Sequence, residues 1–158
     1  MFQAEPARMQ SVISETLQKL NNETNDLSSL TRASPPNCQV NFEFGIAEED
    51  TFTFLNEEEL ARLTEALKRQ EAMSILDFFC VIRYHQTMQD GKAKSLKSDY
   101  VLLRFAFRRR IMELFLVHQR GIQHLPLGDL TIFLINRINS ELTQKRIPLL
   151  VLKRMRTL

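Results

Sequence analysis

Apolar and polar residues alternate along three stretches in the middle of the chain. The stretches are LDFFCVIRYH (residues 76–85), YVLLRFAFRR (residues 100–109) and IMELFLVHQR (residues 111–120). They are rich in β-branched and aromatic residues, and a period of two with this composition is typical of β-strands. The pattern therefore predicts an antiparallel meander of three strands, which we expect to form the centre of the fold.

Two turns fix the register of this meander, because facing residues of paired strands share one side of the sheet. Asp90-Gly91 is a strong two-residue turn signal, and Arg109-Arg110 occupies the second connection. The residues expected on a core side are Phe78, Cys80, Val101, Leu103, Phe105 and Phe107. The pairs expected on the other side are Asp77 with Arg104, Phe79 with Leu102, Val81 with Tyr100, Tyr100 with Gln119, Leu102 with Val117, Arg104 with Phe115 and Arg108 with Ile111.

Both sides of the meander carry apolar residues at mid-height, so each side needs a cover. Helices of the same chain can cover one side, and a partner can cover the other. Aromatic residues and arginine are enriched at protein interfaces, and the mixed side combines them with aliphatic residues. The interface candidates on this side are Tyr100, Leu102, Arg104, Ile111, Phe115 and Val117.

Helical spacing of apolar residues marks the start of the chain. Residues 5–20 place an apolar stripe along one side of an amphipathic helix. The following residues are rich in Asn, Ser, Thr and Pro, which favour turns. The sequence predicts an N-terminal amphipathic helix (1–21), a linker (22–37) and a single α+β domain (38–158), with the helix either docked on the domain or reaching to another subunit.

The domain begins with a second alternating pattern, in residues 40–46 and 52–54. A hairpin with a five-residue loop, from Ala47 to Thr51, would set Phe44 opposite Phe54 on one face. Asn56 followed by Glu59 matches a helix capping box, and the leucine spacing after it predicts a helix ending near Ala72.

Pro126 suits the first turn of another helix, whose apolar residues recur up to Leu142. The final segment, IPLLVLKRMRTL, fits either a short helix or a last strand, and its basic end favours the helix. The predicted fold is α+β, with a five-stranded antiparallel sheet made of a two-strand hairpin, a helix and the three-strand meander, and with helices packed on it.

This element order resembles that of roadblock and longin-type domains, in which the intervening helix lies on one face of a five-stranded antiparallel sheet. The second half alone is also similar in order to signal-recognition-particle Alu proteins and to double-stranded RNA-binding domains. The likeness is one of element order and involves no motif. The helix opening PLGDLT lacks the lysines that double-stranded RNA-binding domains present to phosphates.

The charges of the chain are unevenly distributed. Residues 1–60 have a net charge of −8 and residues 61–158 a net charge of +10. Of all 158 residues, 44% are hydrophobic. Either the acidic half neutralises the basic half within the fold or a dimer, or the basic half faces an anionic partner such as nucleic acid. The candidates for anion or nucleic-acid contacts are Lys92, Lys94, Lys97, Arg108, Arg109, Arg110, Arg154 and Arg156.

The sequence contains no catalytic or cofactor motif. The four glycines stand too far apart for a phosphate-binding loop, and neither Cys38 nor Cys80 has metal-ligand spacing around it. His85, His118 and His124 lie near predicted strand ends and are not expected to converge. We therefore predict no enzyme activity, no cofactor and no metal site.

The N-terminus MFQAEPARMQ has no basic segment followed by an apolar run, and no stretch approaches about 18 apolar residues. We expect a soluble, cytoplasmic protein without a transmembrane segment. The sequence favours a non-enzymatic binding or assembly module that acts through the sheet as a homodimer or with a protein partner. The alternative is nucleic-acid binding through the basic second half.

Overall fold

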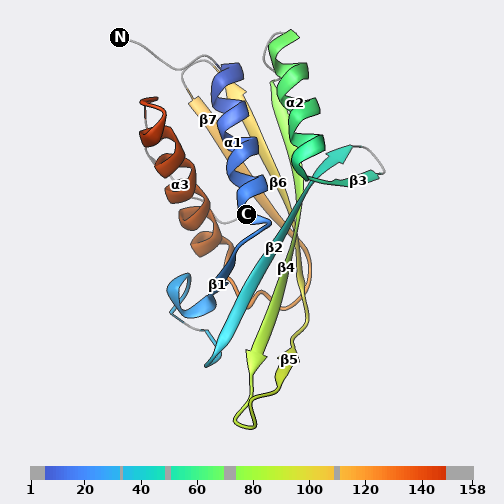
Figure 1. The fold of residues 1–158 in the computed structure, drawn as a ribbon, viewed down its shortest axis with the longest axis vertical. Coiled ribbons are helices and arrows are strands. Elements are labelled where there is room, and N and C mark those ends of the chain that lie inside the picture. Colours follow the sequence, from blue (N-terminus) through green and yellow to red (C-terminus); the bar gives the residue numbers. More distant parts are fainter. Residues whose placement is uncertain (1–5, 33, 49–50, 70–73, 109–110, 149–158) are drawn as a thin grey trace.

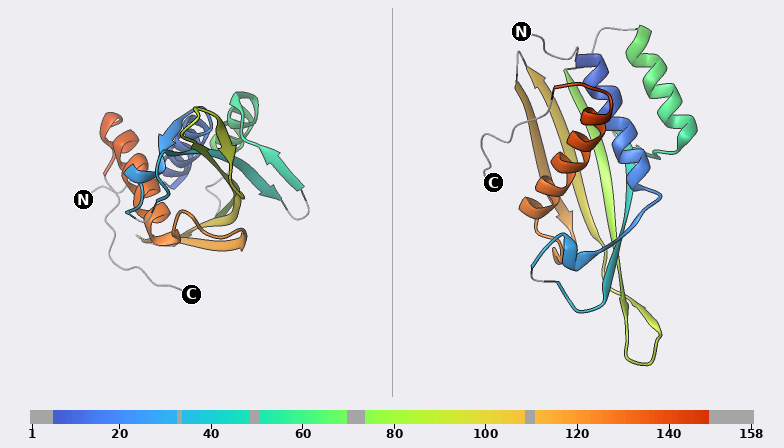
Figure 2. Two further views of the ribbon diagram at one scale, coloured as in Figure 1. Left: turned by 90° about the horizontal axis from the view of Figure 1, so that it is seen from below. Right: turned by 60° about the vertical axis from the view of Figure 1, so that its left-hand side comes forward.

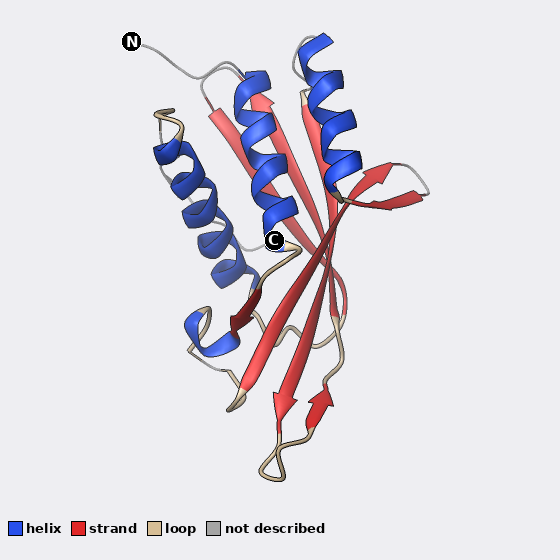
Figure 3. Ribbon diagram, in the orientation of Figure 1, coloured by secondary structure: helices blue, strands red, loops and turns tan. Residues whose placement is uncertain are grey.

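The computed structural model of the chain describes residues 6–32, 34–48, 51–69, 74–108 and 111–148. Within these residues, three α-helices pack on one antiparallel sheet of seven strands (Figures 1 and 3). The helices are α1 (Pro6–Leu20), α2 (Glu57–Arg69) and α3 (Leu127–Gln144). The strands are β1 (Thr24–Asp26), β2 (Cys38–Glu48), β3 (Thr51–Phe54), β4 (Ile75–Thr87), β5 (Ala93–Ser95), β6 (Asp99–Arg108) and β7 (Ile111–Arg120).

The main path of the sheet is β1-β2-β4-β6-β7, with β3 paired to β2 and β5 paired to β4. The predicted α+β class, with a hairpin, a helix and an antiparallel meander, is confirmed. Strands β1 and β5 were not predicted, because each has only three residues (TND and AKS) without an apolar alternation. Of the described helices, none is long and apolar enough to cross a bilayer.

All three helices lie on the same face of the sheet, which we call the inner face (Figure 2). Helix α1 is central in this layer and contacts α2, α3 and β2. Its residues Ile13 and Leu17 are fully buried, as are Leu130 and Leu134 of α3. The N-terminal helix is therefore docked on the rest of the fold, and the segment expected to be a linker contains β1 and a short 3-10 helix, Leu27–Ser29.

Asn21 fastens the C-terminal end of α1 to the sheet. Its side-chain amide donates to the carbonyl oxygens of Phe44 at 3.1 Å and Leu55 at 3.0 Å, and its Oδ1 accepts from the Phe44 N–H at 2.6 Å. These bonds satisfy backbone groups where β2 and the start of α2 approach each other. They fix the position of α1 relative to two other elements.

The predicted register of the meander is confirmed between β4 and β6, where Asp77 pairs with Arg104 and Phe79 with Leu102. Between β6 and β7 it is confirmed for the pairs from Arg108–Ile111 to Val101–His118. One predicted pair is wrong, because Tyr100 pairs with Arg120 and not with Gln119. A β-bulge inserts Gln119 as an extra residue of β7. The bulge brings Arg120 to the same face as Tyr100.

The predicted register of the first hairpin is also wrong. Strand β2 extends to Glu48 and β3 begins at Thr51, so Gly45 and not Phe44 pairs with Phe54. A shift of one residue moves side chains to the opposite face. Phe44 is fully buried on the inner face, whereas Phe54 is 43% exposed on the outer one.

The cap of α2 follows the prediction, since Asn56 Oδ1 accepts a hydrogen bond from the Glu59 N–H at 2.8 Å. The predicted end of this helix near Ala72 lies outside the described residues, and so does the conformation of residues 149–158. Helix α3 begins directly after Pro126, as the sequence indicated.

Candidate functional site

The outer face of the sheet, opposite the helices, carries one row of paired residues across five strands. The row runs from β3 to β7 and consists of Phe54, Gly45, Phe79, Leu102 and Val117. Each neighbour in this row is a direct cross-strand partner, so the side chains share one face. The row is apolar from one edge of the sheet to the other.

Residues beside this row widen it. Val81 pairs with Tyr100 on one side of the row, and Phe115 of β7 lies on the other. The rings of Phe79 and Tyr100 are 6.2 Å apart between centroids and tilted by 41°, a favourable aromatic geometry. We call this surface the outer apolar band, and it comprises Phe54, Phe79, Val81, Tyr100, Leu102, Phe115 and Val117.

Ion pairs border the band. Arg104 forms a bidentate pair with Asp77, with Nε–Oδ1 at 2.8 Å and Nη2–Oδ2 at 2.9 Å. On the other side, Arg83 pairs with Glu43 at 2.8 and 3.3 Å. The hydrogen bonds that Arg104 donates to Asp77 raise the pKa of Arg104 above its usual value, so this guanidinium stays charged. Arg83 and Arg104 are therefore each neutralised within the chain.

The structure places the six predicted interface residues on this outer face, but not all of them in the band. Tyr100, Leu102, Phe115 and Val117 belong to the band, and Arg104 is held at its border. Ile111 lies at the beginning of β7 opposite Arg108, three rows from the Leu102 row.

Sequence reasoning missed three members of the band, for two reasons. Phe79 and Val81 already stood opposite Leu102 and Tyr100 in the predicted register, so the sequence contained the signal for both. Phe54 was expected to share a face with Phe44, because a five-residue loop was predicted for the first hairpin. Four of the seven exposed large apolar side chains among the described residues lie on the outer face, namely Phe54, Ile75, Ile111 and Val117.

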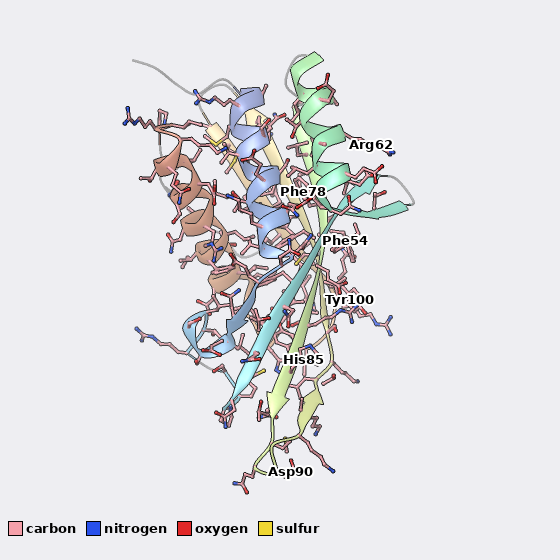
Figure 4. All side chains as sticks on the ribbon, viewed as in Figure 1. Phe54, Arg62, Phe78, His85, Asp90 and Tyr100 are labelled. Carbon is pink, nitrogen blue, oxygen red and sulfur yellow. The ribbon has the colours of Figure 1, made fainter. Side chains whose placement is uncertain are left out.

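The predicted basic residues do not form one surface. Lys92, Lys94 and Lys97 are exposed on or beside the β4–β5 ribbon, which projects beyond the sheet with Asp90 at its tip (Figure 4). Arg108 stands at the opposite end of the sheet and pairs with Glu113 at 3.0 Å. The other candidates lie outside the described residues, and these are Arg109, Arg110, Arg154 and Arg156.

The acidic and basic halves of the chain contact each other through ion pairs. Glu15 pairs with Lys145 at 2.8 Å, and Glu23 pairs with Arg137, whose Nη2 lies 2.6 Å from Oε2. The Glu43–Arg83 pair on the outer face also joins the two halves. Part of the charge asymmetry is therefore neutralised inside the fold.

A buried carboxylate, Asp99 at the start of β6, organises a polar cluster that the sequence did not indicate. It is 1% exposed and accepts hydrogen bonds from Tyr84 Oη at 2.5 Å and His118 Nε2 at 3.0 Å. It also accepts from the backbone N–H groups of Gln123 at 2.7 Å and His124 at 3.2 Å. His118 and His124 thus both contact Asp99, the first through its ring and the second through its backbone N–H.

Two features show how closely this cluster is built. A side chain at Gly121 would place its Cβ 2.2 Å from Asp99 Oδ1, and the φ of Gly121 is +112°. Burial, and then the hydrogen bond to Asp99, raise the pKa of Tyr84 far above its ordinary value, so its hydroxyl remains a donor. The cluster fastens the loop before α3 to β4 and β6. His85 is separate from it and lies between Gln39 and Ser95 on neighbouring strands.

Other chemistry on the described part of the chain is limited. No group of three His, Cys, Asp or Glu side chains there is arranged to hold a metal ion. Cys38 and Cys80 are buried free thiols, and burial raises the pKa of Cys80 well above its usual value. Shallow depressions lie along α2 and beside Asp26 and Gln39, away from the Asp99 cluster.

The outer apolar band is thus the candidate site that the cross-strand pairing of the described residues defines. Comparison with known proteins gives no match to a family model, to a curated protein or to a solved structure.

Proposed function

We propose that this protein is a non-enzymatic association module that binds a second copy of itself or another protein subunit through the outer apolar band. The observation that carries the proposal is the unbroken apolar row from Phe54 to Val117 on the face without helices. An antiparallel sheet that faces water normally shows polar side chains there. A contiguous apolar surface is typical of an interface.

The charges on this face favour a protein partner over a nucleic acid. Arg83 and Arg104 are two of the cations that flank the band, and each is bound to a carboxylate of the chain. Arg120, the cross-strand partner of Tyr100, lies on the same face at the end of β7. Phosphate contacts by Arg83 and Arg104 would require their ion pairs to break. An apolar centre with a polar border is the usual composition of a protein interface.

Light scattering coupled to size exclusion tests the proposal. The purified protein should have a mass above the 18.5 kDa of one chain at micromolar concentration. Leu102→Asp and Phe115→Ala should lower this mass, because central interface residues contribute most to association. Ile132→Asp is the matched control, since Ile132 is 45% exposed on α3, away from the band.

If the band instead awaits a different subunit, the isolated chain is a monomer with an open apolar surface. A dye that fluoresces on apolar surfaces should then bind the wild type and the Ile132→Asp variant, and bind Leu102→Asp less. A monomer that does not bind the dye contradicts the proposal, because it shows that the band is already covered.

The β4–β5 ribbon supports a second candidate function, nucleic-acid binding. Lys92, Lys94 and Lys97 are exposed there, and a two-stranded ribbon has the width of a DNA major groove. Affinity would fall with salt by a slope of about −0.9 per phosphate contacted. Replacing the three lysines with Ala should flatten that slope, whereas Arg62→Ala on α2 should not. Absence of salt-sensitive binding at micromolar concentration would exclude this function.

A further inference from the structure

Strand β7 forms one edge of the main sheet, and among the described residues it pairs only with β6. It is ten residues long, from Ile111 to Arg120. One side of its backbone therefore presents a row of N–H and C=O groups that no described strand pairs with. Such an edge is a template for another strand unless charges, Pro or a cover protect it.

The burial of β7 differs from that of its neighbour. None of its ten residues is fully buried, whereas β6 buries Asp99, Val101, Leu103 and Phe105. Six of the ten are nevertheless large apolar residues, namely Ile111, Met112, Leu114, Phe115, Leu116 and Val117. Edge strands are less buried than central ones, and a long edge strand that is also apolar is a template for pairing with another strand.

Charges that usually protect an edge are scarce here. Glu113 is the single charged residue between Ile111 and Val117, and it is paired with Arg108 at 3.0 Å. The bulge at Gln119 marks the point where regular pairing ends. About eight residues are therefore free to pair with a strand of matching composition.

We propose that β7 pairs antiparallel with β7 of a second copy, so that two sheets join into one across a twofold axis. The opposite edge of the sheet does not match it, because β1 and β3 have only three and four residues. A pairing of β7 with itself is also closed, whereas a pairing of two different edges would continue into a fibre.

The register follows from which residues share a face. A twofold axis at Leu116 sets Phe115 opposite Val117 of the second copy and brings Glu113 opposite the Gln119–Arg120 bulge of that copy. An axis at Phe115 would instead set Glu113 opposite Val117, and an axis at Leu114 would set it opposite Phe115. The axis at Leu116 therefore joins apolar to apolar and acid to base.

This edge contact is distinct from docking on the outer apolar band, but the two are compatible. Pairing at β7 leaves the band uncovered and joins the bands of two copies into one surface of twice the length. The β7 contact shares Phe115 and Val117 with the band, but it is carried by the backbone groups of the β7 edge, whereas Leu102 of β6 lies only in the band. The inference therefore does not depend on the proposed function, and Leu102→Asp distinguishes the two.

A charge exchange tests the contact in the full chain. Glu113→Lys and Arg120→Glu should each raise the dissociation constant of the dimer about tenfold or more, by placing like charges opposite each other twice per dimer. The double variant should restore the wild-type value. Arg108→Ala is the control, since it removes the pair of Glu113 within the chain and should leave the dimer intact.

Cross-linking tests the register. Leu116→Cys should join two copies through a short bifunctional maleimide, because the two Cβ atoms at the axis lie about 5 Å apart. Leu114→Cys should not, since its two copies are separated by four residues along the strand. The wild type is the background control, because Cys38 and Cys80 are buried.

The outcomes of these experiments distinguish pairing at the β7 edge from association through the outer apolar band. Cross-linking at Leu116→Cys together with rescue by charge exchange supports the β7 contact. A dimer that Leu102→Asp dissociates, without that cross-link or that rescue, overturns the β7 contact and leaves the proposed function in place. A strict monomer without cross-linking also overturns it.

Discussion

Tyr84 of β4 and Asp99 of β6 are joined by a hydrogen bond of 2.5 Å inside the protein, where both residues are 1% exposed. The same Tyr84 hydroxyl accepts a hydrogen bond from the Leu125 N–H at 3.1 Å. Asp99 accepts three further bonds, so this pair connects the centre of the sheet to the loop that leads into α3.

Replacing Asp99 with Asn should lower the free energy of unfolding by about 2–5 kcal/mol, because donors at a buried carboxylate lose a charged acceptor. Chemical denaturation followed by circular dichroism measures the change. Asp90→Asn at the exposed ribbon tip should change stability by less than about 0.5 kcal/mol. Equal effects of the two variants would show that the Asp99 cluster does not stabilise the fold.

Two glycines at positive φ give a matched comparison. Gly121→Ala should cost about 2–4 kcal/mol, because its Cβ would overlap Asp99 and its φ of +112° is strained for alanine. Gly91→Ala has the strain of a φ of +80° but no atom within 4 Å of the new Cβ, so about 1 kcal/mol is expected. The difference between the thermal midpoints of the Gly121→Ala and Gly91→Ala variants measures the destabilisation that the overlap with Asp99 causes. Similar midpoints would contradict the close packing around Asp99.

The pKa of Tyr84 predicts how stability depends on alkaline pH. Burial and the hydrogen bond to Asp99 raise this pKa in the folded state, so protonated Tyr84 stabilises the fold. This contribution is complete below the usual tyrosine pKa of about 10 and is lost as pH rises above it. The unfolding free energy should therefore decline above pH 10 less steeply in Tyr84→Phe than in the wild type.

Tyr100→Phe provides the matching control, because the chain has two tyrosines and this variant keeps only Tyr84. In this variant, the ultraviolet absorbance of tyrosinate should appear only when the protein unfolds. Ionisation of Tyr84 at its ordinary pH in the folded protein would show that the hydroxyl is not held by Asp99.

Helix α1 should be essential to the stability of the domain. Leu17→Ala removes a fully buried side chain and should cost about 2–5 kcal/mol. Lys19→Ala, which breaks an exposed ion pair with Glu141, should cost less than about 1 kcal/mol. If Leu17→Ala were as mild as Lys19→Ala in denaturant titrations, α1 would be an accessory helix and not part of the core.

The meander could be predicted because its signals are local. Alternation identifies the strands, and the turn at Asp90-Gly91 fixes which residues face each other, so the Asp77–Arg104 pair followed from counting. The helices cover the side expected to be the core, on which Phe78, Leu103 and Phe105 are buried. The bulge at Gln119 has no signal in the alternation.

The first hairpin and the Asp99 cluster show two further limits. The acidic residues between Phe44 and Phe54 include no strong turn former, so loops of two and five residues were both compatible with the pattern. From the sequence alone, Asp99 would be expected to be a solvent-exposed charge at the start of a strand. Its partners Tyr84 and His124 come from opposite sides of it in the sequence, and only the three-dimensional fold brings them together.

The central position of α1 has a consequence for the growing polypeptide. The pair of Lys19 with Glu141 spans 122 residues, and that of Glu15 with Lys145 is longer still. Because α1 is synthesised before α3, its side that contacts α3 stays uncovered while β2, α2 and the meander are made. This side of α1 is thus the apolar surface of the nascent chain that chaperones could bind for longest before the fold closes.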